Sequence, residues 1–153
     1  MNITVLHGPN LNLLGVREPE IYGTDTLPAI NASIEKFADE FGHTVTMEQH
    51  NGEGGLVDAI QRARLTSEGI VINPAGYSHT SVAIRDALLA TGVPTVEVHL
   101  SVPEAREEFR QISLISDIVI GRISGFGGDG YLLALQGLIR HIEEMQADDS
   151  SGS

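Results

Sequence analysis

Side chains of catalytic type gather in the segment from His7 to Gly23, HGPNLNLLGVREPEIYG. It joins an apolar run to the first helical pattern, although such connections usually have about 2–6 residues and longer ones are often functional. Within it, Tyr22 follows Arg17 at a distance of five residues. A tyrosine hydroxyl acts as a base near neutral pH only when a cation stabilises the phenolate, which a guanidinium can do. Taken alone, such a pair is more often an aromatic ring with a stacked arginine.

A second candidate is the pair Glu97 and His99 at the end of another apolar run. Residues two apart on a strand point to the same face. A carboxylate held against one imidazole nitrogen fixes the tautomer and leaves the other nitrogen to exchange a proton. A lone histidine on a strand is usually structural. Because His99 lies at the carboxyl end of its strand with Glu97 beside it, a catalytic role is here as well supported as a structural one.

Ser101 and Arg110 indicate a site for an anion. Ser101 and Glu104 form a capping-box pattern, which predicts a helix that begins at Ser101. Amides at a helix N-terminus bind anions such as carboxylates, and Arg110 would add a bidentate partner. The structural alternatives are a simple cap for Ser101 and a surface ion pair of Arg110 with Glu107 or Glu108.

Other polar clusters give weaker signals. His79, in the run from Asn73 to Ser81, can belong to a helix cap or bind substrate hydroxyls. The run GFGGDG, residues 125–130, lacks the lysine of a phosphate loop and predicts a flexible turn before the last helix. The 6 histidines show no ligand spacing and the chain has no cysteine, so we expect no metal site.

Alternating strand and helix patterns must position these residues. Strands are expected at 3–6, 44–48, 69–73, 95–99 and 117–121, in Val- and Ile-rich runs typical of parallel sheets covered on both faces. Helices are expected at 27–41, at 55–65, from a cap at Thr80 or Ser81 to Gly92, from Ser101, and at 130–145. The pattern predicts an α/β, flavodoxin-like three-layer sandwich with a five-stranded parallel sheet of order 2-1-3-4-5. Ligands of such folds bind at the carboxyl ends of the strands, so the candidates should converge there.

Composition narrows the classes of function. The 153 residues predict one catalytic domain over 1–146, and the segment ADDSSGS at 147–153 predicts a disordered acidic, Ser- and Gly-containing tail. A net charge of −12 argues against nucleic-acid binding and requires any anion site to be built locally. We see no signal peptide or transmembrane pattern, so we expect a cytoplasmic protein with no membrane partner. The one lysine, Lys36, lies on a solvated helical face, which disfavours Schiff-base chemistry.

Five segments together resemble the type II 3-dehydroquinate dehydratases: GPNLNLLGVREPEIYG, NPAGYSHTSVAIRDAL, VEVHLS, AREEFR and GDGYLLAL. The resemblance runs in order from Met1 to about Ile142. It implies a cofactor-independent lyase of the shikimate or quinate pathway, the former leading to aromatic amino acids. This lyase dehydrates 3-dehydroquinate, an anionic cyclic polyol ketone, to 3-dehydroshikimate. It also implies a homo-oligomer, a dodecamer of flavodoxin-like subunits.

The resemblance also implies roles for single residues. Tyr22 would be the base that takes the C2 proton, Arg17 the cation that activates it, and His99 the acid that protonates the departing C1 hydroxyl. Asn10 would stabilise the enolate through a bound water, and Glu97 would orient His99. The backbone amides after the fourth strand would hold the substrate carboxylate, and one residue would reach the site from a neighbouring subunit. These substrate-binding positions are Asn73, His79, Leu100, Ser101, Arg110 and, from the neighbour, Asp86.

Two positions depart from the family pattern. Gly55 stands where an acidic residue is usual, and Val102 follows Ser101 where Asn is common. These departures bear on the stability of the second helix and on local cap geometry. They leave the proposed base and acid untouched.

Three alternatives remain open at this stage. A flavin- or nucleotide-binding flavodoxin-like protein would need a phosphate loop rich in Ser, Thr and Gly after the first strand, and GPNLNLLG is a poor one. A receiver-type signalling domain would need Asp where Asn73 stands, and a lysine after the fifth strand. An inactive paralogue would not be expected to retain Arg17, Tyr22 and His99 together.

Overall fold

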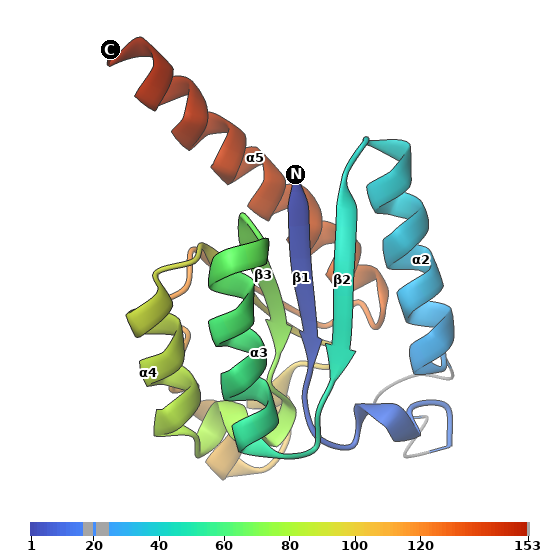
Figure 1. The fold of residues 1–153 in the computed structure, drawn as a ribbon. Coiled ribbons are helices and arrows are strands. Elements are labelled where there is room, and N and C mark those ends of the chain that lie inside the picture. Colours follow the sequence, from blue (N-terminus) through green and yellow to red (C-terminus); the bar gives the residue numbers. More distant parts are fainter. Residues whose placement is uncertain (17–19, 21–24, 153) are drawn as a thin grey trace.

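A parallel sheet forms the middle layer of the protein (Figure 1). The structure is a computed structural model that describes residues 1–16, 20 and 25–152. Its strands, in chain order, are β1 (Asn2–His7), β2 (Thr44–Gln49), β3 (Gly69–Asn73), β4 (Thr95–His99) and β5 (Gly121–Ser124). They pair in parallel in the order β2-β1-β3-β4-β5. The predicted strand order and flavodoxin-like α/β class are therefore confirmed.

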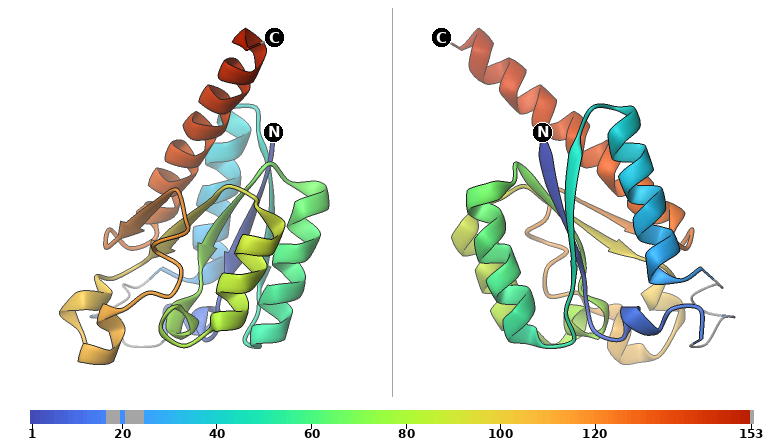
Figure 2. Two further views of the ribbon diagram at one scale, coloured as in Figure 1. Left: turned by 90° about the vertical axis from the view of Figure 1, so that its left-hand side faces the viewer. Right: turned by 45° about the vertical axis from the view of Figure 1, so that its right-hand side comes forward.

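Two pairs of helices cover the two faces of the sheet (Figures 1 and 2). Helices α2 (Leu27–Glu40) and α5 (Asp129–Ser151) lie on one face, and α3 (Glu53–Thr66) and α4 (Val82–Thr91) on the other. Along β1, Ile3 and Val5 belong to the core beneath α2 and α5, whereas Leu6 belongs to the core beneath α3 and α4. This alternation explains why the central strands are continuously apolar, since both faces are buried.

Local signals explain where the helices begin and end. The Thr26 hydroxyl accepts a hydrogen bond from the Ala29 amide at 3.3 Å and caps α2, with Pro28 in the first turn. The Ser81 hydroxyl accepts from the Ile84 amide at 2.9 Å and caps α4. Helix α4 ends at Thr91 and is followed by Gly92, whose φ of 68° lies in the left-handed region that glycine adopts without strain.

The predicted helix from Ser101 is wrong. The chain forms two short 3₁₀ turns instead, Pro103–Ala105 and Glu108–Gln111, and no side chain caps either of them. A capping pattern stabilises a helix only when an apolar stripe behind it can be buried, and here Val102 and Phe109 are exposed. The described part of the chain consequently holds four α-helices rather than five.

The predicted fifth strand, 117–121, is also displaced. Strand β5 begins at Gly121, while Ile118 and Val119 pack against the core beneath α3 and α4. A short apolar run can form a strand or a buried turn, and its periodicity does not separate the two. The shift matters for the site because it places Arg122 beside Glu97 in the β4–β5 register.

Helix α5 continues past the body of the sheet and projects from it (Figure 1). Residues 147–151 form its last, exposed turns, in the tail for which composition predicts disorder. Disorder of this tail, and the 1–146 domain boundary, remain predictions. Among the helices of the described residues, none combines the length and the apolar character needed to cross a bilayer.

Candidate active site

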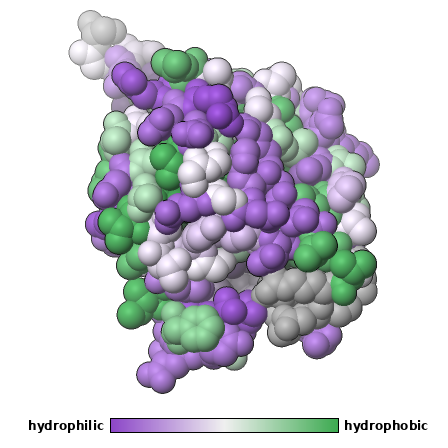
Figure 3. All heavy atoms as spheres, turned by 60° about the horizontal axis from the view of Figure 1, so that its bottom comes forward, coloured by the Kyte–Doolittle hydropathy of each residue, from purple (hydrophilic) through white to green (hydrophobic). Residues whose placement is uncertain are grey.

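A small cavity of about 140 Å³ lies at the end of the molecule where the parallel strands finish. This end presents many hydrophilic residues with hydrophobic ones between them (Figure 3). The segments that follow β1, β3 and β4 all contribute to the cavity, as expected for the carboxyl edge of such a sheet. The candidates from the sequence that line it are Asn10, Asn73, His79, His99, Leu100, Ser101 and Arg110.

The other candidates lie elsewhere. Glu97 is buried behind His99, and Asp86 is exposed on α4, outside the residues that line the cavity. Arg17 and Tyr22 lie outside the described residues. A larger groove of about 580 Å³ runs between α2 and α5, but Phe37, Phe41 and Ile139 line it and none of the candidates does. The larger of the two hollows is therefore not the one that holds the candidate catalytic residues.

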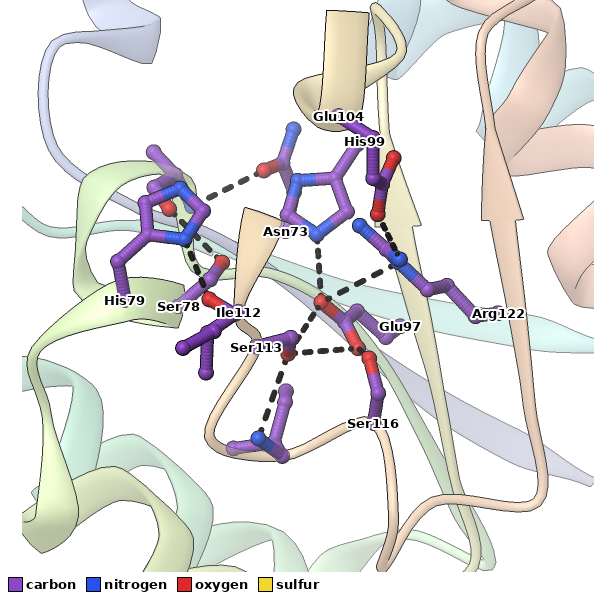
Figure 4. Close-up of polar contacts among 12 residues, drawn as sticks. Asn73, Ser78, His79, Glu97, His99, Glu104, Ile112, Ser113, Ser116 and Arg122 are labelled. Carbon is purple, nitrogen blue, oxygen red and sulfur yellow. Dashed lines mark hydrogen bonds and ion pairs between the residues drawn. The ribbon is translucent and has the colours of Figure 1, made fainter. Parts of the chain in front are cut away.

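The His99 ring is fixed by Glu97 (Figure 4). Its Nε2 lies 2.5 Å from a Glu97 carboxylate oxygen, and Glu97 is completely buried while His99 is 6% exposed. A carboxylate accepts, so Nε2 carries the proton and Nδ1 is the nitrogen available to a ligand in the cavity. The carboxylate also stabilises the imidazolium form, which is what an acid in this position needs.

Several donors keep the Glu97 carboxylate charged. Ser116 donates to it at 2.6 Å and Ser113 at 2.9 Å, and the Arg122 Nε lies 3.7 Å away (Figure 4). Burial raises the pKa of the Glu97 carboxyl, but the hydrogen bonds from His99 and the two serines outweigh it and hold the pKa below its usual value. Glu97 therefore presents a negative charge to His99 at neutral pH.

Sequence reasoning missed Ser113, Ser116 and Arg122. The serines precede β5 in an irregular stretch that carries no motif. Arg122 stands directly opposite Glu97 in the β4–β5 pairing, so a correct position for the fifth strand would have found it. Arg122 also forms an ion pair with Glu104, which ties the segment after β4 to β5.

His79 is held in one tautomer. Its Nδ1 lies 2.7 Å from the Ile112 carbonyl oxygen, which can only accept, so Nδ1 donates (Figure 4). In the neutral ring Nε2 then carries a lone pair and can accept a hydrogen bond from a ligand hydroxyl. This geometry suits the hydroxyl-binding interpretation of His79.

Arginines give the cavity a local positive charge. Arg106 and Arg110 both line it, although the chain as a whole carries −12. The Arg110 guanidinium pairs with Glu107 and lies 4.9 Å from the centroid of the Phe109 ring. The surface ion pair considered above is thus present, and it holds an arginine that also faces the cavity. Sequence reasoning missed Arg106, which stands in the AREEFR segment.

Two loops are braced against the cavity. The carbonyls of Leu100 and Ser101 accept from the amides of Gly127 and Gly125, both at 3.0 Å, so the Gly-rich turn fixes the segment after β4. Asn10 has a left-handed φ of 69°, and its amide donates to the Asn51 side chain at 3.0 Å. The backbone of both loops is therefore set before a ligand enters.

The arrangement can transfer a proton to a bound anion that carries hydroxyl groups. In such a transfer His99 would hold the proton, Glu97 would stabilise the charged ring, and the arginines would attract the anion. Among the described residues, no group of three or more His, Asp or Glu side chains could hold a metal ion.

The sequence matches the family model described as "Dehydroquinase class II" over residues 1–139. This chain belongs to the class II dehydroquinase family. The 3-dehydroquinate dehydratase of Geotalea daltonii is 54% identical over 144 residues, which cover 94% of this chain and 100% of that protein. Its namesake from Acaryochloris marina is 56% identical over 142 residues, covering 93% and 95% of the two chains.

Solved structures of class II dehydroquinases share the fold. The type II dehydroquinase of Butyrivibrio crossotus superposes with a TM-score of 0.88 at 42% identity, covering 90% of this chain and 97% of its own. That of Propionibacterium acnes gives 0.86 at 44% identity, covering 90% and 94%. Membership of the family thus rests on sequence and on fold together.

Proposed function

We propose that this protein dehydrates 3-dehydroquinate to 3-dehydroshikimate, without a cofactor, in the shikimate pathway. The observation that carries the proposal is the buried Glu97–His99 pair beside a cavity that also holds Arg106 and Arg110. The relatives named 3-dehydroquinate dehydratase, about half identical to this chain over nearly its whole length, supply the substrate.

The reaction removes a proton from C2 and a hydroxide from C1. Tyr22, as a phenolate kept charged by Arg17, takes the C2 proton and leaves an enolate at the ketone. A water held by Asn10 stabilises that oxyanion, and a good donor in a preorganised site contributes about 3–4 kcal/mol. The His99 imidazolium then protonates the C1 hydroxyl, which leaves as water. Tyr22 has gained one proton and His99 has lost one, so solvent resets both.

Binding uses the remaining candidates. The substrate carboxylate is held by Arg110 and by the backbone amides of Leu100 and Ser101. Asn73 and His79 bind substrate hydroxyls, and the lone pair on His79 Nε2 supports this role. We also propose a cytoplasmic homododecamer in which Asp86, exposed on α4, reaches the site of a neighbouring subunit. Light scattering of the purified protein measures the size of the assembly, and cell fractionation measures its location.

The test is direct turnover. Purified protein is incubated with 3-dehydroquinate, and the enone product is followed by its ultraviolet absorbance. Wild-type protein should produce it, whereas Tyr22→Phe and His99→Ala should each lower kcat by at least about 100-fold, as expected for loss of a proton-transfer group. No product from folded wild-type protein would refute the proposed activity. Near-normal turnover by either variant would remove that residue from its role.

A further inference from the structure

Asn73 stands at the head of a buried chain of hydrogen bonds that the proposed reaction does not use. Its Nδ2 lies 3.2 Å from the Tyr131 hydroxyl, and that hydroxyl lies 2.8 Å from His7 Nδ1. The other nitrogen of His7, Nε2, lies 2.8 Å from Asn31 Oδ1. Tyr131 and His7 are both completely buried, and they come from the start of α5 and the end of β1.

The direction of every hydrogen bond in this chain follows from its ends. The Ala75 amide donates to Asn73 Oδ1 at 3.1 Å, so the opposite end of that side chain is the NH₂ group. It donates to the Tyr131 oxygen, and at the other end Asn31 Oδ1 can only accept, so in the neutral ring His7 Nδ1 accepts the Tyr131 proton. His7 then carries its proton on Nε2 and donates to Asn31 Oδ1. Burial, which lowers the pKa of His7 to about 4, keeps the ring in this neutral form.

We infer that Tyr131 and His7 are positioning residues that fix Asn73 as a hydrogen-bond donor to the substrate. Tyr131 engages one Nδ2 proton of Asn73 and the Ala75 amide holds its oxygen, so the second Nδ2 proton is the donor left for a ligand. Asn73 therefore presents an N–H donor that suits an acceptor oxygen on the substrate. This inference rests on the proposed dehydratase function.

A double-mutant cycle separates positioning from general stabilisation. Tyr131→Phe removes one oxygen atom and keeps the ring, which packs edge-on against His7 at 5.1 Å between centroids. In the wild-type background it should lower kcat/KM about tenfold, mainly through KM, since the Asn73 contact already exists in the bound ground state. In the Asn73→Ala background it should lower kcat/KM less than about twofold. Equal losses in both backgrounds, or no loss in the wild type, would overturn the inference.

Two further variants keep the inference testable if Tyr131→Phe folds poorly. Asn73→Asp places an acceptor where the donor stood, while Ala75 and Tyr131 can both still donate to it. It should be less active than Asn73→Ala by at least about fivefold, and activity equal to or above that of Asn73→Ala would contradict the donor assignment. His7→Gln keeps one donor and one acceptor and should retain activity within about threefold, whereas His7→Leu should match Tyr131→Phe.

An NMR measurement decides the geometry without turnover. The side-chain amide signals of Asn73, assigned by their loss in Asn73→Ala, should show one proton shifted downfield by Tyr131. That shift should collapse in Tyr131→Phe, and an unchanged signal would refute the positioning role. If folded wild-type protein converts no 3-dehydroquinate, the proposed function is refuted. The effect of Tyr131 on the Asn73 amide signal then still tests whether Tyr131 positions Asn73.

Discussion

Replacing Glu97 with Gln is the sharpest test of how the His99 acid works. The substitution keeps the shape of the side chain and one acceptor oxygen, but it removes the negative charge that lies 2.5 Å from His99 Nε2. At about 4 Å between charge centres and an effective dielectric constant near ~20, the attraction is roughly 4 kcal/mol. Desolvation offsets part of it, and a hydrogen bond between charged groups contributes about 1.5–3 kcal/mol net.

We therefore expect Glu97→Gln to lower kcat about 30- to 150-fold, from a loss of about 2–3 kcal/mol of transition-state stabilisation. The loss should fall on kcat more than on KM, because the imidazolium is used in the elimination step rather than in binding.

The assay is enone formation measured from pH 5 to 10. Ser113→Ala is the matched control, because it removes one of the two serine donors to Glu97 and keeps the charge. It should cost less than about tenfold. A kcat of Glu97→Gln within threefold of wild type would refute the role of Glu97 as the charge partner of His99.

Three other changes follow from the structure. Burial holds the pKa of His7 at about 4 against 6.5 in the unfolded chain, so the folded protein binds fewer protons and loses stability as pH falls from 6.5. Urea unfolding at pH 7 and 4.5 should show about 2–3 kcal/mol of this loss in wild type and none of it in His7→Gln. Gly8→Ala should cost about 1–3 kcal/mol, because its Cβ would lie 2.6 Å from the Pro74 carbonyl oxygen. Gly54→Ala, where nothing lies within 4 Å, is the thermal-melting control and should be neutral or stabilising. Ser81→Ala should cost about 0.5–2 kcal/mol by chemical denaturation through loss of the α4 cap, and an unchanged midpoint would contradict that.

Local patterns were enough for much of the fold. Signals within a few residues mark these elements. They are the starts of α2 and α4 near Thr26 and Ser81 and the apolar runs of β1, β3 and β4, and those elements form where the sequence predicts them. The segment after Ser101 and the fifth strand do not form as predicted. A capping pattern without an apolar stripe behind it does not specify a helix, and a short apolar run can form either a strand or a buried turn.

The site divides in the same way. Residues at the carboxyl ends of strands could be assigned to one cavity because the parallel architecture brings those ends together. The supporting residues could not, since they arrive through register and packing between distant segments. Arg122 meets Glu97 only across the β4–β5 pair, and Tyr131 meets His7 across 124 positions of sequence.

That separation has a kinetic consequence. Parallel strands cannot pair through a tight hairpin, and each crossover must close a long loop before its contacts form. The cavity draws on the segments that follow β1, β3 and β4, so a chain in which any of these strands is unpaired lacks the site. Native-like helix content on refolding should therefore return before catalytic competence, and the lag between them measures the time needed to close the sheet.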